Sequence, residues 1–384
     1  MNVAIIRTEP FPFGNASIFR TMQLSKLISS CGNEVTVIAS KINIDDYTKD
    51  WWSQAYPSLT YLAYENESLE KCLDKILSER RPDVVIGQSS IRHYSEIHEA
   101  AKKHGIPFVL DSVEWHNASN WRFGYLDPRY YRFLFMWRYC FTKVDGIIAI
   151  SRMIESYYKA YLKNVIRIPT ITDTEQTTPR LETSNNRIRF IFSGQLDSSK
   201  DNIRYFVEAM DRVDPQGNRF QLDIFGPSET EVKKHMGDSY SVLQRHTNII
   251  LHGRVAQEEA QKACRDSDFS VFFRLNRRSA NAGFPTKLGE CMTFGTPAIC
   301  NDTGDISLVL ENGINGYLVK EYSADAIEVV LREIVSSTIE ERQKMRTNAR
   351  KAAELFFDFR LYADQINSVL RNACNAKGAN YGRF

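Results

Sequence analysis

The sequence lacks long hydrophobic runs, a strong charge bias and closely spaced cysteines. None of its stretches approaches the roughly 18 apolar residues of a membrane-spanning helix, so none is expected across the 384 residues. The opening segment MNVAIIRTEP has too short an apolar run for a secretory signal and predicts a strand. The net charge of +2 gives no electrostatic case for nucleic acid, so any anion site must be a local cluster.

The seven cysteines are scattered, odd in number and without a CxxC pair. This pattern argues against a disulfide framework and against a zinc knuckle. Most of the cysteines lie in apolar stretches, where buried reduced thiols are expected. The cysteine usage therefore predicts a cytoplasmic protein.

Short apolar strands alternate with helical patterns along the whole chain. The strands expected in the first half are 2–8, 34–40, 82–89, 107–113 and 145–151. Those expected in the second half are 188–194, 220–226, 248–253, 269–274, 296–302 and 316–319. Strands that are apolar on both faces and separated by helices indicate parallel sheets covered on both sides.

The chain is thus predicted to be an α/β protein with two consecutive Rossmann-like halves. A polar, Thr-rich stretch without periodicity predicts a linker at 170–187. The first domain is expected over 1–169, completed by the C-terminal helix 358–384, and the second over 188–357. Ligands of such sheets bind at the carboxyl ends of the strands, so two facing sheets would form a cleft.

Two loops of the first half are candidate sites. Gly14 follows the first strand without a GxGxxG pattern, and the neighbouring Asn15 and Ser17 suit a plain helix N-cap as well as a ligand loop. His116 lies in the polar segment EWHN after the fourth strand. It could hydrogen-bond a substrate hydroxyl or transfer a proton, or it could be a structural histidine that caps a loop.

Two segments of the second half carry cations after strands. Gly194 permits close backbone approach, and Lys200 at the following helix start could complement a phosphate or be a solvated surface lysine. The three arginines Arg274, Arg277 and Arg278 form a local basic patch. Contact with a phosphate or an acidic sugar and simple exposure to solvent are equally compatible with this patch.

The segment GFPTKLGE, residues 283–290, combines a turn with a helix start. The backbone N–H groups from Gly283 to Lys287 lie where a helix begins and could hold an anion. Glu290 lies about one turn further along and could accept two vicinal hydroxyls, as in ribose recognition. The alternative is a glutamate that is exposed or caps the helix.

The run WRFGYLDPRYYRFLFMWRYCFTK, residues 121–143, is rich in aromatic and basic residues. Trp, Tyr and Arg together suggest attachment to a membrane interface. The same apolar residues fit a helix buried against the sheet. We favour the core interpretation, and the two are not exclusive.

Six motifs together resemble the family 4 glycosyltransferases, also called glycosyltransferase group 1. They read SGQLDSSKDNI, LHGRVAQEEA, GFPTKLGECMTFGTPAIC and NDTGDISLVLENGINGYLV in the second half, and DGIIAISRMIESYY and VIRIPTITD in the first. The resemblance implies a GT-B fold, in which two Rossmann-like domains face each other across a cleft. It also implies a retaining, metal-independent transfer of a sugar from a UDP- or GDP-linked donor.

The resemblance implies roles for individual residues. The family's donor-site residues match Gly14, Gly194, Lys200, Gly283, Phe284, Pro285, Thr286, Lys287 and Glu290, and its cleft histidine matches His116. Among these, His116, Lys200 and Glu290 are the expected catalytic residues. Two positions depart from the family pattern: Ala282 replaces the first glutamate of its E-x7-E motif, and Gln195 replaces an arginine. Arg274 or its basic neighbours are then expected to supply the missing diphosphate contact.

The acceptor implied by the resemblance is a glycan or a lipid-linked glycan. Bacterial surface polysaccharide or lipopolysaccharide synthesis, at the inner face of a membrane, is the expected setting, with no nucleic-acid partner. The alternatives are a nucleotide-sugar epimerase of the same fold and a nucleotide-sugar-binding protein with weak catalysis.

Overall fold

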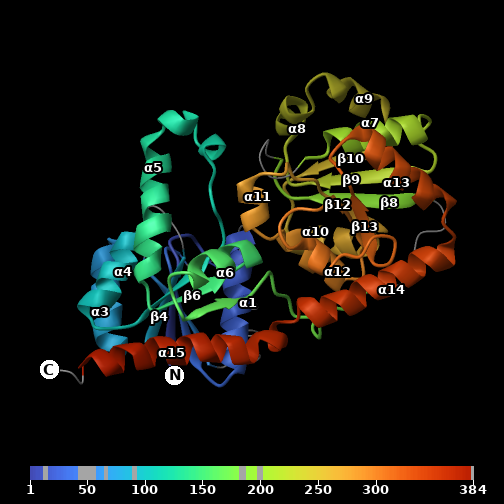
Figure 1. The fold of residues 1–384 in the computed structure, drawn as a ribbon. Helices are drawn as coiled ribbons and strands as arrows, with labels where there is room; N and C mark the ends of the chain where they lie inside the picture. Colours follow the sequence, from blue (N-terminus) through green and yellow to red (C-terminus); the bar gives the residue numbers. More distant parts are fainter. Residues whose placement is uncertain are drawn as a thin grey trace. The chain divides into compact units, whose positions relative to one another are not determined.

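The computed structural model describes residues 1–11, 16–41, 58–64, 68–88, 93–180, 187–196 and 202–381. The chain divides into two compact units, which are described separately (Figure 1). Unit 1 comprises Met1–Ile171, Ala282–Phe284 and Asp358–Phe384. Unit 2 comprises Thr172–Asn281 and Pro285–Phe357.

Unit 1 is built on a seven-stranded parallel sheet with the order β3-β2-β1-β4-β5-β6-β7. Its strands are β1 (Asn2–Ile6), β2 (Glu34–Ala39), β3 (Leu59–Ala63), β4 (Val84–Gln88), β5 (Phe108–Ser112), β6 (Gly146–Ala149) and β7 (Val165–Arg167). The five predicted strands are present. The sequence prediction omitted β3 and β7, which are short edge strands with partly exposed side chains and therefore lack the continuous apolar pattern of the inner strands.

The helices of unit 1 lie between these strands or after the last one. They are α1 (Ala16–Ser30), α3 (Leu69–Arg80), α4 (Tyr94–Lys103), α5 (Pro128–Phe135), α6 (Arg152–Lys159) and α15 (Ala363–Tyr381). The last helix contributes Ile366, Val369 and Leu370 to the same buried cluster as Val3 and Ile148. Helix α15 is thus part of the core of the first sheet.

Unit 2 is built on a six-stranded parallel sheet with the order β10-β9-β8-β11-β12-β13. Its strands are β8 (Ile188–Ser193), β9 (Phe220–Phe225), β10 (Ile249–Gly253), β11 (Phe269–Val271), β12 (Ala298–Asn301) and β13 (Gly316–Val319). All six predicted strands are present. Phe190 on the central strand packs its ring against Phe206, Phe220 and Phe269 at centroid distances of 5.1, 5.3 and 5.9 Å.

Helices separate the strands of unit 2 and complete it. They are α7 (Arg204–Val213), α8 (Glu229–Met236), α9 (Tyr240–Arg245), α10 (Gln257–Asp266), α11 (Arg278–Ala282), α12 (Thr286–Thr293), α13 (Ala324–Ser336) and α14 (Ile339–Phe356). In each sheet the first strands along the chain are added on one side of the starting strand and the later strands on its other side. This change of side falls between β1 and β4 in the first sheet and between β8 and β11 in the second. Ligands of doubly wound sheets bind outside the carboxyl ends of the strands at such a switch point.

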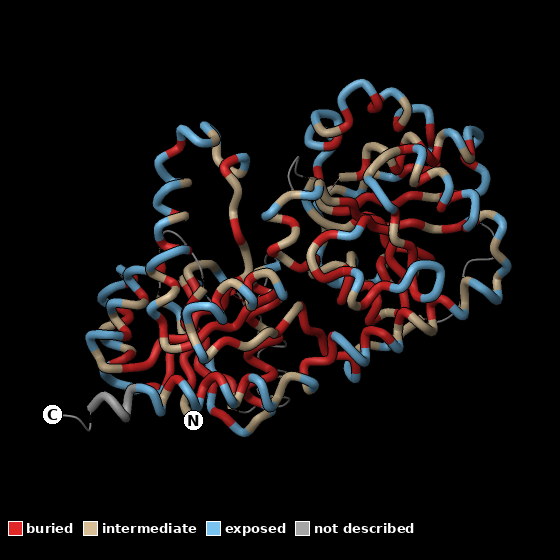
Figure 2. Tube along the Cα trace, viewed as in Figure 1, coloured by how far each residue is buried: buried red, intermediate tan, exposed pale blue. Residues whose placement is uncertain are grey.

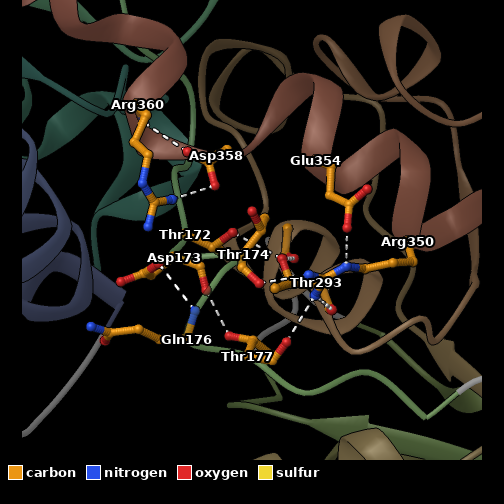
Figure 3. Close-up of polar contacts among 11 residues, drawn as sticks. Thr172, Asp173, Thr174, Gln176, Thr177, Thr293, Arg350, Glu354, Asp358 and Arg360 are labelled. Atoms are coloured by element: carbon orange, nitrogen blue, oxygen red, sulfur yellow. Dashed lines mark hydrogen bonds and ion pairs between the residues drawn. The ribbon is translucent and has the colours of Figure 1, made fainter.

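The start of the Thr-rich stretch predicted as a linker is held by hydrogen bonds within unit 2 (Figure 3). The guanidinium of Arg350 donates to the carbonyl oxygens of Thr174 at 2.6 Å, Thr177 at 3.1 Å and Thr293 at 2.6 Å. The hydroxyl groups of Thr172 and Thr293 lie 2.8 Å apart. One arginine on α14 therefore ties this irregular segment to the end of α12.

The structure corrects the prediction of reduced thiols for two cysteines. Cys264 on α10 and Cys291 on α12 form a disulfide with their Cα atoms 6.0 Å apart. They are 27 positions apart in the chain, and the packing of two helices brings them together. Close spacing in the sequence is therefore no guide to this pair. The other five cysteines are not disulfide-bonded.

Candidate functional site

Glycines end three neighbouring strands of unit 2 at its switch-point side. Gly194, Gly226 and Gly253 follow or close β8, β9 and β10 with φ values of 145°, 109° and 65°. The N–H of Gly194 donates to the Phe225 carbonyl at 3.0 Å, and that of Gly226 to Gly253 at 2.7 Å. A Cβ atom on Gly226 would collide with the Gly194 carbonyl oxygen. No side chain fits at Gly226, and the lack of a side chain at all three glycines lets a ligand approach the main chain closely.

The loop after β8 returns to the sheet beside Arg274. Gln195 is exposed at the start of this loop, and Lys200 lies outside the described residues. Asn202 resumes the chain, and its N–H donates to the Phe273 carbonyl at 2.8 Å. The backbone of Arg274 is fixed by Asn301, whose side chain accepts from the Arg274 N–H at 2.8 Å and donates to its carbonyl at 2.7 Å. Arg274 is thereby held at the carboxyl end of β11.

The start of α12 lies against the end of β8. Pro285 is the residue before the helix and has extended backbone angles, and its carbonyl accepts from the Leu288 N–H at 3.2 Å. The ammonium of Lys287 lies 4.4 Å from the ring centroid of Phe192, which is two residues before Gly194. The predicted turn and the predicted glycine are therefore neighbours, and Thr286 and Lys287 form the first turn of the helix.

Glu290 lies on α12, one turn beyond this start, and is half-buried. Burial raises the pKa of its carboxyl group from 4.5 to about 7, and the positive charge of Lys287 opposes that rise. A carboxylate that has lost much of its hydration accepts hydrogen bonds from ligand hydroxyls more favourably than an exposed one, because it has fewer waters to give up. Glu290 therefore lies on the predicted helix and has a raised pKa. A strongly shifted pKa is typical of functional sites, so Glu290 is a candidate site residue.

Polar side chains occupy the carboxyl ends of β1, β4 and β5 in unit 1. The guanidinium of Arg7 donates to the hydroxyl of Ser17, which in turn donates to Gln88 Oε1 at 2.9 Å. Burial lowers the pKa of Arg7 to about 10. Ser17 is the second residue of α1, so its hydroxyl serves this cluster and not the N-cap that sequence reasoning allowed. Gly14 and Asn15 lie outside the described residues.

A buried ion pair supports the same edge of the first sheet. Arg20 on α1 donates from Nε to both carboxylate oxygens of Asp111 at 3.0 Å and from a terminal nitrogen at 2.8 Å. It also donates to the carbonyl oxygens of Ile168 and Pro169 at 3.1 and 2.7 Å. The sequence analysis did not predict this pair. The signal that could have pointed to it is Asp111 itself, a charged residue at the carboxyl end of an otherwise apolar strand.

His116 belongs to the loop after β5, as predicted. Its Nε2 atom lies 3.1 Å from a carboxylate oxygen of Glu114, and its ring packs against Phe133 at 4.7 Å and Trp121 at 5.6 Å between centroids. The side chain is 24% exposed. The imidazole is therefore oriented by an acid and two aromatic rings while part of it stays accessible to a ligand.

The two units divide the predicted 283–287 turn between them. Gly283 and Phe284 group with unit 1, whereas Pro285, Thr286 and Lys287 group with unit 2. Ala282, which stands where the family pattern has a glutamate, accepts a hydrogen bond of 2.6 Å at its carbonyl from the hydroxyl of Ser151. Ser151 also caps α6 by accepting from the Ile154 N–H.

The described parts of the chain lack two further features. No group of three or more His, Cys, Asp or Glu side chains is placed to hold a metal ion. None of the described helices has the length and apolar character needed to cross a membrane.

Two parallel α/β units, each with a functional-site pattern at its strand ends, define a two-domain protein of the GT-B fold. The chain belongs to the group 1, or family 4, glycosyltransferases. The family model described as glycosyl transferases group 1 matches residues 173–352, and the model described as glycosyltransferase family 4 matches residues 20–176.

Individual relatives agree with this assignment. The chain is 23% identical over 135 residues to the amylovoran biosynthesis glycosyltransferase AmsK of Erwinia amylovora. That match covers 35% of this chain and about a third (33%) of the length of AmsK. Anabaena HepE, crystallised with UDP, covers 97% of this chain and 100% of its own at 14% identity and a TM-score of 0.69. The lipopolysaccharide outer core galactosyltransferase WaaB covers 96% and 99% at 19% identity and a TM-score of 0.60.

Proposed function

We propose that this protein moves a sugar from a UDP- or GDP-linked donor to a hydroxyl of a glycan or lipid-linked glycan. The observation that carries the proposal is Glu290, a half-buried carboxyl with a pKa near 7, one turn into a helix that starts against the end of β8. The UDP and glucose bound to Anabaena HepE, a protein of the same fold, support a nucleotide-sugar donor. The Erwinia relative is named for amylovoran biosynthesis, which supports a biosynthetic role. The setting we propose is bacterial surface polysaccharide synthesis at the cytoplasmic face of a membrane.

The donor would be held mainly by unit 2. In this proposal Glu290 accepts hydrogen bonds from the two ribose hydroxyls, and the glycine edge at Gly194 lets the nucleotide approach the main chain. The diphosphate would meet the start of α12 at Thr286 and Lys287, where backbone N–H groups and a positive charge favour an anion. Arg274 would supply the cation that Gln195 cannot.

Catalysis would consist mainly of stabilising the leaving group. The bond from the anomeric carbon to the diphosphate oxygen breaks, the acceptor oxygen forms the new bond on the same face, and its proton passes to the diphosphate. Lys200 and the helix N–H groups would stabilise the charge that develops on the diphosphate, and no metal is required. His116, oriented by Glu114, would position the sugar or the acceptor hydroxyl.

The proposal is tested by a donor screen followed by transfer assays. Thermal shift with UDP- and GDP-sugars identifies the donor, and radiolabelled transfer to glycan acceptors measures turnover. Lys200→Ala and Glu290→Ala are expected to lower transfer at least about a hundredfold, the usual effect of losing one electrostatic contact to the transition state. The matched control is Glu258→Gln, on the exposed first turn of α10. Near-normal turnover in both variants would reject the proposed site.

Two other outcomes would redirect the assignment. Conversion of the donor to an epimer in the absence of acceptor would make the protein an epimerase. Tight donor binding without transfer to any acceptor would make it a nucleotide-sugar-binding protein.

Single Arg→Ala substitutions at Arg274, Arg277 and Arg278 test whether one of these arginines supplies the missing diphosphate contact. Unchanged donor affinity in all three variants would refute that role.

A further inference from the structure

The segment from Trp121 to Lys143, here called the α5 arm, projects from the first sheet (Figure 1). It contains α5 and a π-helical turn at Met136–Cys140, preceded by short 3-10 turns at Ala118–Asn120 and Gly124–Leu126. Figure 2 shows exposed residues along the tip and the outer side of the arm. The favoured core interpretation holds for one side of the arm only, because apolar side chains on its other side are exposed.

The inner face of the arm is anchored in the core of unit 1. Phe133 and Trp137 are 1% and 0% exposed. The indole N–H of Trp137 donates to the Glu114 carbonyl at 2.9 Å, and its ring stacks on Trp115 at 3.9 Å between centroids. The arm is therefore held in place by the loop that carries His116.

The outer face and the tip expose six large apolar or aromatic side chains. Their exposed fractions are 61% for Phe123, 70% for Tyr125, 87% for Leu126, 55% for Tyr131, 59% for Phe135 and 52% for Tyr139. The last three recur every four residues, which places them on one ridge of the helix. Phe135 and Tyr139 stack at 5.3 Å between ring centroids, so the ridge is continuous. Scattered exposed hydrophobics are ordinary, but a contiguous set on one element marks an interaction surface.

The exposed charges of the arm are all basic. Five arginines and lysines occur between residues 121 and 143, against one acid. That acid, Asp127, is 1% exposed and is used by the helix itself, because it caps α5 and pairs with Arg129 at 2.7 Å. The ammonium of Lys143 lies 3.6 Å from the Tyr139 ring centroid, so cations flank the apolar ridge.

We propose that the α5 arm docks on the surface of an anionic lipid bilayer. Tyr and Phe side chains with an adjacent fringe of Arg and Lys match the chemistry of the boundary between acyl chains and negatively charged headgroups. The tip residues Phe123 and Leu126 enter that boundary, and the basic residues meet the headgroups. Burial of the aromatic ridge in a second copy of the chain would bring like charges together, which disfavours a symmetric self-contact.

The inference goes beyond the transfer reaction, because it needs only the arm and no donor. It would place the His116 loop, on which Phe133 and Trp137 pack, close to a membrane that carries a lipid-linked acceptor. That consequence rests on the proposed function, whereas docking itself does not.

Docking is measured by co-sedimentation of the full chain with two kinds of vesicle. One is phosphatidylcholine alone, and the other is a two-to-one mixture of phosphatidylcholine and phosphatidylglycerol. The wild type is expected to sediment with the anionic vesicles, with affinity that falls as salt is raised. Sedimentation with neither vesicle overturns the proposal.

Two double variants separate the charge from the apolar tip. Arg132→Gln with Arg138→Gln is expected to weaken binding to anionic vesicles about 30-fold, since each basic residue near such a surface contributes about fivefold. Its control is Lys344→Gln with Lys351→Gln, at exposed positions of α14. Phe123→Ser with Leu126→Ser is expected to abolish sedimentation at moderate salt.

The apolar control is Val329→Ser with Leu355→Ser, whose side chains are 66% and 70% exposed on α13 and α14. Equal losses in the arm and control variants would overturn the inference. So would an arm-dependent self-association, measured by sedimentation velocity, without vesicle binding.

Donor binding by thermal shift in the absence of lipid keeps the two proposals apart. Arm variants should retain it, so a failure of vesicle binding leaves the transfer proposal standing. Conversely, Glu290→Ala tests only the donor site. If it loses donor binding or transfer but still binds vesicles, the docking proposal is unaffected.

Discussion

Replacement of Glu290 by glutamine should raise the free energy of unfolding at alkaline pH, although it removes a charged residue from a candidate site. The carboxyl group has a pKa of about 7 in the folded chain against an ordinary 4.5, because burial disfavours its ionised form. Between these two pH values the folded state binds the proton more tightly than the unfolded state does. Stability from this group is therefore complete below about pH 4.5 and is lost as the pH rises through about 7.

The magnitude follows from the distance between the two pKa values. At 1.36 kcal/mol for each tenfold change in proton affinity, ionising the folded carboxyl above pH 7 costs about 3 kcal/mol. This is an upper bound, because the side chain is only half-buried and solvent screens part of the effect. Glutamine has nearly the same shape and does not ionise. The variant and the wild type should therefore have similar stability below about pH 4.5, diverge as the pH rises toward about 7, and keep a constant difference above that pH.

The assay is hydrogen exchange of peptides from unit 2, measured between about pH 5 and 8.5 under conditions where exchange reports opening free energies. A local readout is needed because a chain with two compact units need not unfold in a single step. Glu258→Gln on the exposed face of α10 serves as the charge-matched control. Parallel pH profiles for the wild type and Glu290→Gln would refute the reasoning, as would a gap that opens toward acid.

Three further substitutions test the supports of the site. Arg350→Ala removes three hydrogen bonds to backbone carbonyls and the ion pair with Glu354. It should lower the opening free energy of unit 2, measured by hydrogen exchange, by at least about 3 kcal/mol, with Lys351→Ala as the silent control. Gly226→Ala should lower the melting temperature far more than Gly237→Ala. Both glycines have positive φ, but only a Cβ atom at position 226 would collide with the Gly194 carbonyl oxygen. Equal shifts in melting temperature would contradict this steric argument. Arg20→Ala leaves a buried carboxylate unpaired and should destabilise unit 1 by about 3–5 kcal/mol, whereas a change below about 1 kcal/mol would show the pair to be dispensable.

Most of the predicted strands are buried on both faces of a sheet. Inner strands such as β1 and β6, with the sequences NVAII and GIIA, are nearly continuous apolar runs because helices cover both sides of their sheet. The edge strands β3 and β7 have one neighbour each and partly buried side chains, and Thr60 or Arg167 interrupts their short apolar runs. The edge strands β10 and β13 were predicted because their sequences IILHG and GYLV contain longer apolar runs. Pairing across the sheet, and not local preference, makes β3 and β7 strands.

The place of Glu290 on a helix was predictable from the sequence, but its electrostatics were not. The order strand, turn, helix located Glu290 on the first turns of α12, because helix starts and strand ends have local sequence signals. Its raised pKa depends on how much of the carboxyl other segments bury. The ion pair of Arg20 and Asp111 likewise joins residues 91 positions apart. Sequence patterns over neighbouring residues therefore do not predict it.

The α5 arm shows why composition could not decide between core and interface. Its apolar residues occupy both sides of the helix, so their spacing alone predicts a helix buried all round. The structure anchors one side through Phe133 and Trp137, while Tyr131, Phe135 and Tyr139 lie on the exposed side. An aromatic ridge that stays in water contributes no stabilisation, because the free energy of apolar surface falls only when that surface is removed from water. The exposed ridge is therefore best explained by a surface that buries rings and neutralises cations at once, which an anionic bilayer does.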